Sequence, residues 1–234
     1  MDHIFDKYSK RGAYHWQQVS RNLLNFNAYV MARYQQVVKL IPKQKDLRIL
    51  DIGCGDGVLL GLIGCGHLYG VDLDKASLDY AATRIRAKLV KADARNLPFK
   101  AGFFDWVIAT EIIEHLPQPA IMLEEVCRVL KTGGRVILTT PVKSAAGLTD
   151  RLHQLEFSTK ELKELCAGFF RRVKINTSHP FWLKKIYAFS LGKIGRFHFD
   201  LGRWLINALV LLTDWNPFIN LPGRSSQQLV ICQK

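Results

Sequence analysis

The sequence predicts an α/β fold in which helices cover both faces of a mainly parallel sheet. Short apolar runs, typical of buried strands, alternate along the chain with segments whose apolar residues recur at three- and four-residue steps, as in helices. Four glycines lie within Ile49–Gly61, directly after the first of these runs. In open α/β sheets the ligand binds at such a junction, beyond the carboxyl ends of the strands.

The predicted helices and strands follow one another as this fold class requires. Residues 15–41 are predicted to form one or two helices that end before Pro42. Strands are predicted over 47–52, 67–74, 89–94, 104–113, 135–141, 171–177 and 227–234. Helices are predicted over 75–87, 120–130 and 158–167. The segment Val58–Gly70 is short for a full helix and turn, so a clipped helix is expected there.

Composition and charge describe a globular chain with basic flanks. The 234 residues suffice for one well-buried domain with an insertion, and 48% of them are hydrophobic. The formal net charge is +13, yet residues 49–140 carry ten basic against eleven acidic side chains, so the excess lies outside them. Such flanks attract nucleic acid, anionic lipid or an acidic substrate, or only keep the protein soluble.

The cysteines and the first residues point to a reducing compartment. The five cysteines are scattered, and no Cys/His cluster with metal-ligand spacing is present in the sequence, so free thiols and no metal site are expected. Residues 1–10 lack the apolar stretch of a secretory signal. A cytoplasmic location is therefore expected.

The spacing of the glycines separates two classes of nucleotide ligand. A dinucleotide fingerprint needs GxGxxG, and Gly53 and Gly55 fit its first two positions. The third position is Val58, and the next glycine stands at Gly57 instead. The pattern is thus GxGxG, and it follows directly on Asp51.

Two further acids end the next two predicted strands. Asp72 follows Asp51 by 21 residues, a position where a carboxylate can accept both ribose hydroxyls. Asp93 ends the third strand, within reach of an adenine. This ordered set favours S-adenosylmethionine over a dinucleotide as the ligand.

Five segments resemble the class I S-adenosylmethionine-dependent methyltransferases of the small-molecule type. They cover about residues 47–142 and read ILDIGCGDG, GVDLDKASLDYA, KADARNLPF, FDWVIATEIIEHL and VLKTGGRVILTTP. The resemblance implies a Rossmann-like seven-stranded sheet, mostly parallel with an antiparallel last strand. It also implies S-adenosylmethionine as the methyl donor, with S-adenosylhomocysteine as the product.

The resemblance assigns roles to matching residues. The cofactor-binding residues that it implies are Asp51, Gly53, Cys54, Gly55, Gly57, Asp72, Leu73, Asp93, Ala94, Thr110 and Tyr14. Among them, Asp51 and the glycine loop hold the methionine moiety, Asp72 binds the ribose and Asp93 the adenine edge. Tyr14 belongs to an N-terminal segment that often folds over the cofactor in this family. The alternative is that Tyr14, His15 and Trp16 only pack together as an aromatic cluster.

Two histidines are the candidate catalytic residues. Methyl transfer needs a base only if the nucleophile must lose a proton. His115 stands in the loop after the fourth strand and His153 follows the fifth, so each is expected on the ligand face as a base or acceptor contact. For His115 the alternative is a structural loop histidine.

The loop after the fourth strand lacks the Asn/Asp-Pro-Pro-aromatic signature of DNA amine methyltransferases, which disfavours methylation of a nucleic-acid base.

The segment between the last two strands is the most individual part of the chain. The expected organisation is one domain over residues 1–234. Its parts are an N-terminal helical segment 1–46, a cofactor-binding core 47–178, a helical insertion 179–225 and a last strand 226–234. The insertion is expected to cap the substrate pocket. Its apolar stretch Trp204–Leu212 is too short to span a bilayer. The basic, aromatic part 181–215 is therefore a packed cap, a homodimer contact or a peripheral membrane contact.

Three functions remain open from the sequence. The first is an S-adenosylmethionine-dependent methyltransferase that modifies oxygen or carbon of a small hydrophobic or acidic acceptor. The second keeps this chemistry with RNA or protein as the acceptor, which the lack of a recognisable nucleic-acid module disfavours. The third is a protein that binds S-adenosylmethionine without catalysis.

Overall fold

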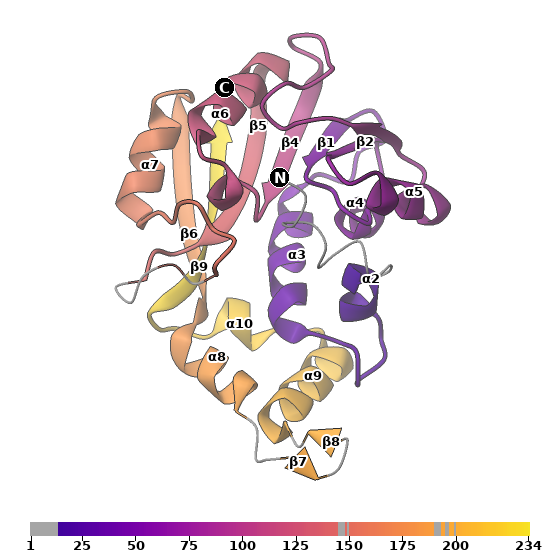
Figure 1. The fold of residues 1–234 in the computed structure, drawn as a ribbon, viewed down its shortest axis with the longest axis vertical. Helices are drawn as coiled ribbons and strands as arrows, with labels where there is room; N and C mark the ends of the chain where they lie inside the picture. Colours follow the sequence, from indigo (N-terminus) through magenta and orange to yellow (C-terminus); the bar gives the residue numbers. More distant parts are fainter. Residues whose placement is uncertain (1–13, 145–147, 149, 190–192, 195–196, 199) are drawn as a thin grey trace.

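In the described part of the chain, seven strands form one sheet in the order β3-β2-β1-β4-β5-β9-β6 (Figure 1). The structure is a computed structural model, and it describes residues 14–144, 148, 150–189, 193–194, 197–198 and 200–234. The strands of this sheet are β1 Arg48–Ile52, β2 His67–Asp72, β3 Lys88–Lys91, β4 Phe104–Thr110, β5 Leu130–Pro141, β6 Arg172–Pro180 and β9 Ser225–Gln233. The strand β9 runs antiparallel to both β5 and β6, and the pairs among β1 to β5 are parallel. The predicted fold class is confirmed.

The helices alternate with the strands as the sequence predicts. The helices are α2 Tyr14–Val19, α3 Ala28–Leu40, α4 Val58–Ile63, α5 Lys75–Arg84, α6 Pro119–Val129, α7 Thr159–Ala167, α8 Phe181–Ala188, α9 Leu201–Thr213 and α10 Pro217–Asn220, with a 3₁₀ turn η1 at Ile113–His115. The short α4 is the expected clipped helix, with Gly57 and Gly64 in the left-handed region at its two ends. The prediction of no secretory signal concerns residues 1–10, which lie outside the described residues.

Two apolar cores lie on opposite faces of the sheet because successive strand residues point to opposite sides. On one face Leu50 and Val107 pack with buried residues of α6 and α7. On the other face Ile49 and Ile108 pack with buried residues of α3 and α4. Both faces of the sheet are therefore covered, and the central strands β1 and β4 are buried on both sides.

The strand order places a ligand crevice between β1 and β4. The strands β2 and β3 lie on one side of β1, and the strand β5 lies on the opposite side of β4. The connections therefore turn to opposite sides at this pair, and their loops separate at the carboxyl ends of the strands. The glycine loop follows β1, and Glu111 begins the loop after β4.

The insertion between β6 and β9 packs on the N-terminal half of α3. Phe26 and Ala32 form a third buried cluster with Leu183 of α8, Val210 of α9 and Phe218 of α10. The insertion also holds a small two-stranded ribbon, β7 Lys193–Ile194 with β8 Phe197–His198. In Figure 1 these elements lie together below the sheet.

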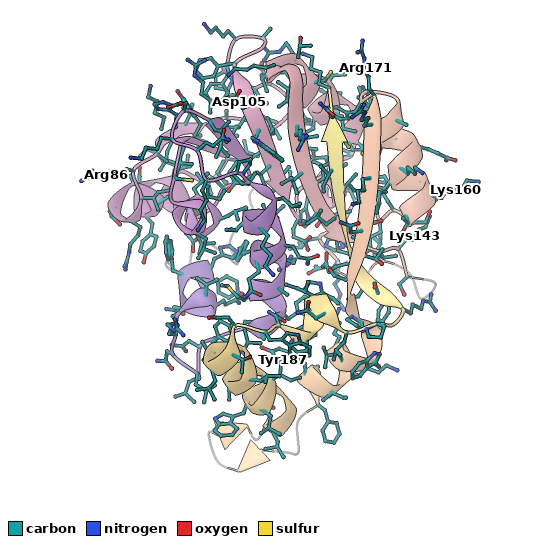
Figure 2. The ribbon with its side chains drawn as sticks, turned by 180° about the vertical axis from the view of Figure 1, so that it is seen from behind. Arg86, Asp105, Lys143, Lys160, Arg171 and Tyr187 are labelled. Atoms are coloured by element: carbon teal, nitrogen blue, oxygen red, sulfur yellow. The ribbon has the colours of Figure 1, made fainter. Side chains whose placement is uncertain are left out.

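A polar contact ties the insertion to the start of α3. Tyr187, labelled in Figure 2, accepts a hydrogen bond from the backbone N–H of Ala28 at 3.0 Å and donates to the side-chain oxygen of Asn207 at 2.8 Å. Asn207 in turn donates to the carbonyl of Phe26 at 2.7 Å. Buried polar groups that are paired in this way fix the orientation of the insertion on α3.

Two further expectations from the sequence can be compared with the structure. All five cysteines lie in the described part of the chain, and each is a free thiol. Among the described helices, none combines the length and the apolar character that crossing a bilayer requires.

Candidate active site

A cavity of about 660 Å³ opens at the carboxyl ends of β1, β2 and β4. Its size is typical of small-molecule sites. The sequence-predicted residues that line it are Tyr14, Asp51, Gly53, Cys54, Gly55, Asp72, Leu73, Asp93, Ala94, Thr110, His115 and His153. Gly57 is the one predicted site residue outside this lining, and it starts α4 with a positive φ of 77°. The structure thus gathers residues from all parts of the predicted core around one cavity.

The glycine loop brings bare backbone to the cavity wall. At Gly53, where φ is +69°, an added Cβ would lie 2.1 Å from Cδ1 of Ile112, which also lines the cavity. At Gly55, where φ is +49°, an added Cβ would meet nothing nearer than the ring of His15, at 3.8 Å. Glycine is therefore required at position 53 by both conformation and space, whereas at position 55 its conformation alone requires it.

Asp51 is the buried acid at the end of β1. Its side chain is only 2% exposed, and its Oδ1 has no hydrogen-bond partner among the residues that the structure describes. Burial, and then the charge of Asp72, raise the pKa of Asp51 well above its usual range. A buried carboxylate oxygen without a donor is costly unless a ligand supplies one. Asp51 therefore fits a ligand that brings an ammonium or hydroxyl group into the cavity.

Asp72 joins the ends of β1 and β2. One oxygen accepts the backbone N–H of Gly55 at 2.8 Å, and the other accepts the N–H of Asp74 at 2.9 Å. Burial raises the pKa of Asp72, and these N–H groups oppose the shift. The carboxylate is held in a fixed orientation, and each oxygen keeps a second lone pair for a ribose hydroxyl.

Asp93 is already engaged by a neighbouring side chain. The guanidinium of Arg95 donates to both of its oxygens, from Nε to Oδ1 at 3.0 Å and to Oδ2 at 3.2 Å, and from Nη2 to Oδ2 at 2.6 Å. These bonds lower the pKa of Asp93. The carboxylate lines the cavity, but its strongest partner is Arg95, a residue that sequence reasoning did not assign to the site.

The N-terminal helix α2 docks on the glycine loop. The backbone N–H of His15 donates to the carboxylate of Asp56 at 2.9 Å, and Trp16 donates its indole N–H to the carbonyl of the same residue at 2.8 Å. Tyr14 and His15 thereby reach the cavity wall. The role of this segment in covering the cofactor stays a prediction.

The two candidate histidines meet although they follow different strands. The backbone N–H groups of Gln154 and Leu155 both donate to the carbonyl of Glu114, at 2.8 and 3.1 Å. These bonds hold the segment after β5 against η1. The rings of His115 and His153 consequently lie 5.1 Å apart, edge to face.

The prediction that the insertion caps the cavity is wrong for the residues that the structure describes. No described residue of 179–225 lines the cavity. The insertion buries its apolar side against the outer part of α3 instead, and the wall is completed by Tyr14, His15, Asp150 and the segment 152–154.

Sequence reasoning missed Arg33 and Tyr34, which α3 contributes to the cavity. Both stand in a helix whose apolar spacing predicts only packing, so no local signal marks them. Arg33 forms an ion pair with Glu111, at the end of β4, with 2.5 Å between Nη1 and Oε2. Glu111 has a positive φ of 55°, which is rare for a residue other than glycine and is typical of functional loops.

Part of the chain around this cavity is similar to known proteins. A model described as a methyltransferase domain matches residues 50–138. A demethylmenaquinone methyltransferase of Geobacillus sp. is 27% identical over 58% of this chain and 60% of that protein. A ubiquinone biosynthesis O-methyltransferase of Nitrosococcus oceani is 35% identical over 40% of this chain and 43% of that protein. The chain thus spans 43–60% of the length of these curated relatives.

A solved structure extends the likeness of the fold to the whole chain. A SAM-dependent methyltransferase of Thermotoga maritima matches with a TM-score of 0.68 and 21% identity, and all of both chains is covered. The family match at residues 50–138 spans the strands and the glycine loop that build the cavity. Residues 50–138 therefore resemble a methyltransferase domain, and the fold of the whole chain is similar to that of a SAM-dependent methyltransferase.

Proposed function

We propose that the protein transfers a methyl group from S-adenosylmethionine to oxygen or carbon of a small, hydrophobic or acidic acceptor. The observation that carries the proposal is that one cavity is lined both by the glycine loop with Asp51 and Asp72 and by the two imidazoles of His115 and His153. Donor and acceptor can therefore be held together in one cavity, as methyl transfer requires.

The donor end fits S-adenosylmethionine. The ammonium group of its methionine moiety supplies the donor that Asp51 lacks, and the fixed carboxylate of Asp72 accepts the ribose hydroxyls. Gly53 and Gly55 let the backbone approach the ligand closely. When bound, the cofactor supplies a sulfonium methyl group that is already activated for displacement.

The acceptor end provides apolar walls and two imidazoles. Leu116 and Leu152 line the cavity together with His115 and His153. Burial lowers the pKa of His115, so its ring is neutral at neutral pH and able to take a proton from an acceptor hydroxyl. Two relatives, a demethylmenaquinone methyltransferase and a ubiquinone biosynthesis O-methyltransferase, support an acceptor of the quinone class.

A peripheral membrane contact through 181–215 follows from this acceptor class. Large apolar side chains of this segment are exposed, namely Trp182, Ile186, Phe189, Leu201, Trp204, Leu205, Leu209, Leu212 and Trp215. Lys184, Lys185 and Arg203 accompany them, which suits an anionic lipid surface. A lipid-soluble acceptor would be met at such a surface.

Sedimentation with vesicles tests the membrane contact. Vesicles with anionic lipid should carry the protein down, and the double variant Trp204→Ser, Leu212→Ser should stay in the supernatant. Leu24→Ser is the matched control, because Leu24 is 82% exposed but lies outside the insertion. Equal sedimentation of all three proteins would contradict the contact and favour the homodimer alternative.

Methyl transfer from tritiated S-adenosylmethionine into a fractionated cell extract tests the activity. Label in the lipid or small-molecule fraction supports the proposal. Label confined to RNA or protein would replace it by the second function, and binding of the cofactor without any transfer would favour a non-catalytic role. Asp72→Ala serves as the inactive control in each fraction.

A further inference from the structure

The segment after β5 carries a buried pair of titratable side chains, His153 and Glu156. Nδ1 of His153 lies 2.7 Å from Oε1 of Glu156, and the two side chains are 9% and 1% exposed. His153 lines the cavity, whereas Glu156 does not. Enzymes use a carboxylate in this place, behind an imidazole, to orient the ring for proton transfer.

Backbone contacts hold the pair against the loop after β4. The N–H groups of Gln154 and Leu155, which stand between the two residues in the chain, donate to the carbonyl of Glu114 at 2.8 and 3.1 Å. The hydrogen bond to Glu156 then fixes the ring of His153 relative to this backbone. The imidazole is therefore held in place before an acceptor arrives, as a catalytic group requires.

Glu156 also determines which nitrogen of His153 carries the proton. An ionised carboxylate only accepts hydrogen bonds, so Nδ1 is the donor and Nε2 has the lone pair. Once Nε2 takes up a proton the ring is a cation, and the negative charge of Glu156 stabilises it across 2.7 Å. The pair is thus suited to accept a proton from a molecule in the cavity.

His115, which also lines the cavity, has a different support. Its Nδ1 lies 3.1 Å from the backbone carbonyl of Leu152, a group without net charge. Burial lowers the pKa of His115; the carbonyl opposes this shift, His153 adds to it, and Glu111 and Asp150 oppose it more weakly. Because the two rings lie 5.1 Å apart, a positive charge on one disfavours a charge on the other. His153 is therefore the better of the two rings to hold the proton.

The carboxyl group of Glu114 lies near both rings without competing with Glu156. One of its oxygens and one nitrogen of each ring all lie within 4.8 Å of one another. Burial, and then the charge of Glu111, raise the pKa of Glu114 well above its usual range, although a hydrogen bond with Thr140 opposes the shift. A carboxyl group that keeps its proton supplies no negative charge, so Glu156 is the carboxylate that stabilises the imidazolium.

We infer that His153 is the base that takes the proton of the acceptor and that Glu156 is its positioning residue. The inference rests on the proposed function, and it concerns an acceptor with a hydroxyl group. The hydroxyl proton passes to Nε2 of His153 and from there to water. The hydroxyl oxygen forms the bond to the methyl carbon, while the C–S bond breaks and its electron pair stays on sulfur.

Rates of methyl transfer from tritiated S-adenosylmethionine into the lipid and small-molecule fraction of the extract test the pair. At about pH 8, His153→Gln should lower the rate at least about a hundredfold and Glu156→Gln at least about tenfold. The double variant should be no slower than His153→Gln, because Glu156 acts only through that ring. His115→Gln should cost less than about tenfold. The matched control is Glu124→Gln, a change of an exposed acid outside the cavity, which should keep the rate of the wild type.

The dependence of the rate on pH separates positioning from support of the fold. Without the carboxylate the protonated ring of His153 is less stable, so the acid limb of the profile should move about one unit to lower pH in Glu156→Gln. Glu156→Asp keeps the charge and should keep the acid limb of the wild type. A residue that only supports the fold would lower the rate equally at every pH.

Each of three results would overturn the inference: a wild-type rate in Glu156→Gln, a double variant slower than His153→Gln, or a larger loss in His115→Gln than in His153→Gln. Circular dichroism checks each fold, and if Glu156→Gln does not fold, a rate of His153→Gln within tenfold of the wild type overturns it. Calorimetry with S-adenosylhomocysteine is run on the same samples. Transfer that neither change affects refutes the pair alone, whereas a wild type without binding or transfer refutes the proposed function and the inference with it.

Discussion

The guanidinium of Arg33, on α3, pairs with the carboxylate of Glu111, at the end of β4, with 2.5 Å between Nη1 and Oε2. The carboxylate also accepts hydrogen bonds from Thr139 at 3.0 Å and from Gln227 at 3.2 Å. This pair connects α3 to the loop that carries Glu114 and His115. It also neutralises a charge that would otherwise stand beside the buried Glu114, whose pKa is raised by burial and then by Glu111.

Removal of Arg33 should destabilise the fold through the unpaired Glu111. Arg33→Met should lower the free energy of unfolding by about 2 kcal/mol, less than for a fully buried pair because both side chains are partly exposed. The double variant Arg33→Met, Glu111→Gln should cost about 1 kcal/mol less than the sum of the single changes. Urea unfolding measures all four proteins. Additive effects would show that the pair is not coupled.

Two glycines with positive φ separate the effect of backbone conformation from the effect of a steric clash. Gly53→Ala places a Cβ 2.1 Å from Cδ1 of Ile112, whereas Gly102→Ala, at a similar φ of +64°, meets nothing within 4 Å. Both changes carry a conformational cost of about 1 kcal/mol. Only Gly53→Ala should also weaken S-adenosylhomocysteine binding, by more than about tenfold, because Ile112 must move into the cavity. Equal affinities of the two variants in calorimetry would contradict this.

His179 should make the fold less stable in acid. Burial lowers its pKa to about 3 in the folded protein, whereas an exposed histidine titrates near 6.5. Between these values the unfolded chain binds more protons than the folded one, so the free energy of unfolding falls as the pH falls through this window. The loss that His179 contributes is about 2 kcal/mol between pH 7.5 and pH 5.

The variant His179→Asn isolates this contribution in urea unfolding at several pH values. Asparagine tolerates the positive φ of 63° at this position but does not titrate. The difference in stability between wild type and variant should therefore change by about 2 kcal/mol over the same pH range. His67→Asn, at an exposed site, should show no such change. A constant difference for His179→Asn would refute the assignment.

The sequence predicts those features that local patterns determine. Apolar runs and their acidic ends locate the strands, so Asp51, Asp72 and Asp93 are found at one edge of the sheet as expected. Pairings between distant segments leave no such pattern. The contact of Arg33 with Glu111 and that of His115 with His153 depend on how α3 and the segment after β5 pack on the sheet.

The position of the insertion is a second feature that the sequence alone does not predict. Its composition predicts an apolar, basic segment after the sixth strand, and its helices are present. The place where it packs, on Phe26 and Ala32 beside α3 rather than over the cavity, depends on long-range contacts such as that of Tyr187 with Ala28.

Calorimetry with S-adenosylhomocysteine tests the central claim, that this cavity binds the methyl donor, most directly. The wild type should bind one molecule per chain, and Asp72→Ala should bind it at least about a hundredfold more weakly, since charge-assisted hydrogen bonds to the ribose are lost. Asp79→Ala, a change of an exposed acid outside the cavity, should bind like the wild type. Absence of binding by the wild type, or equal affinity of Asp72→Ala, would contradict the claim.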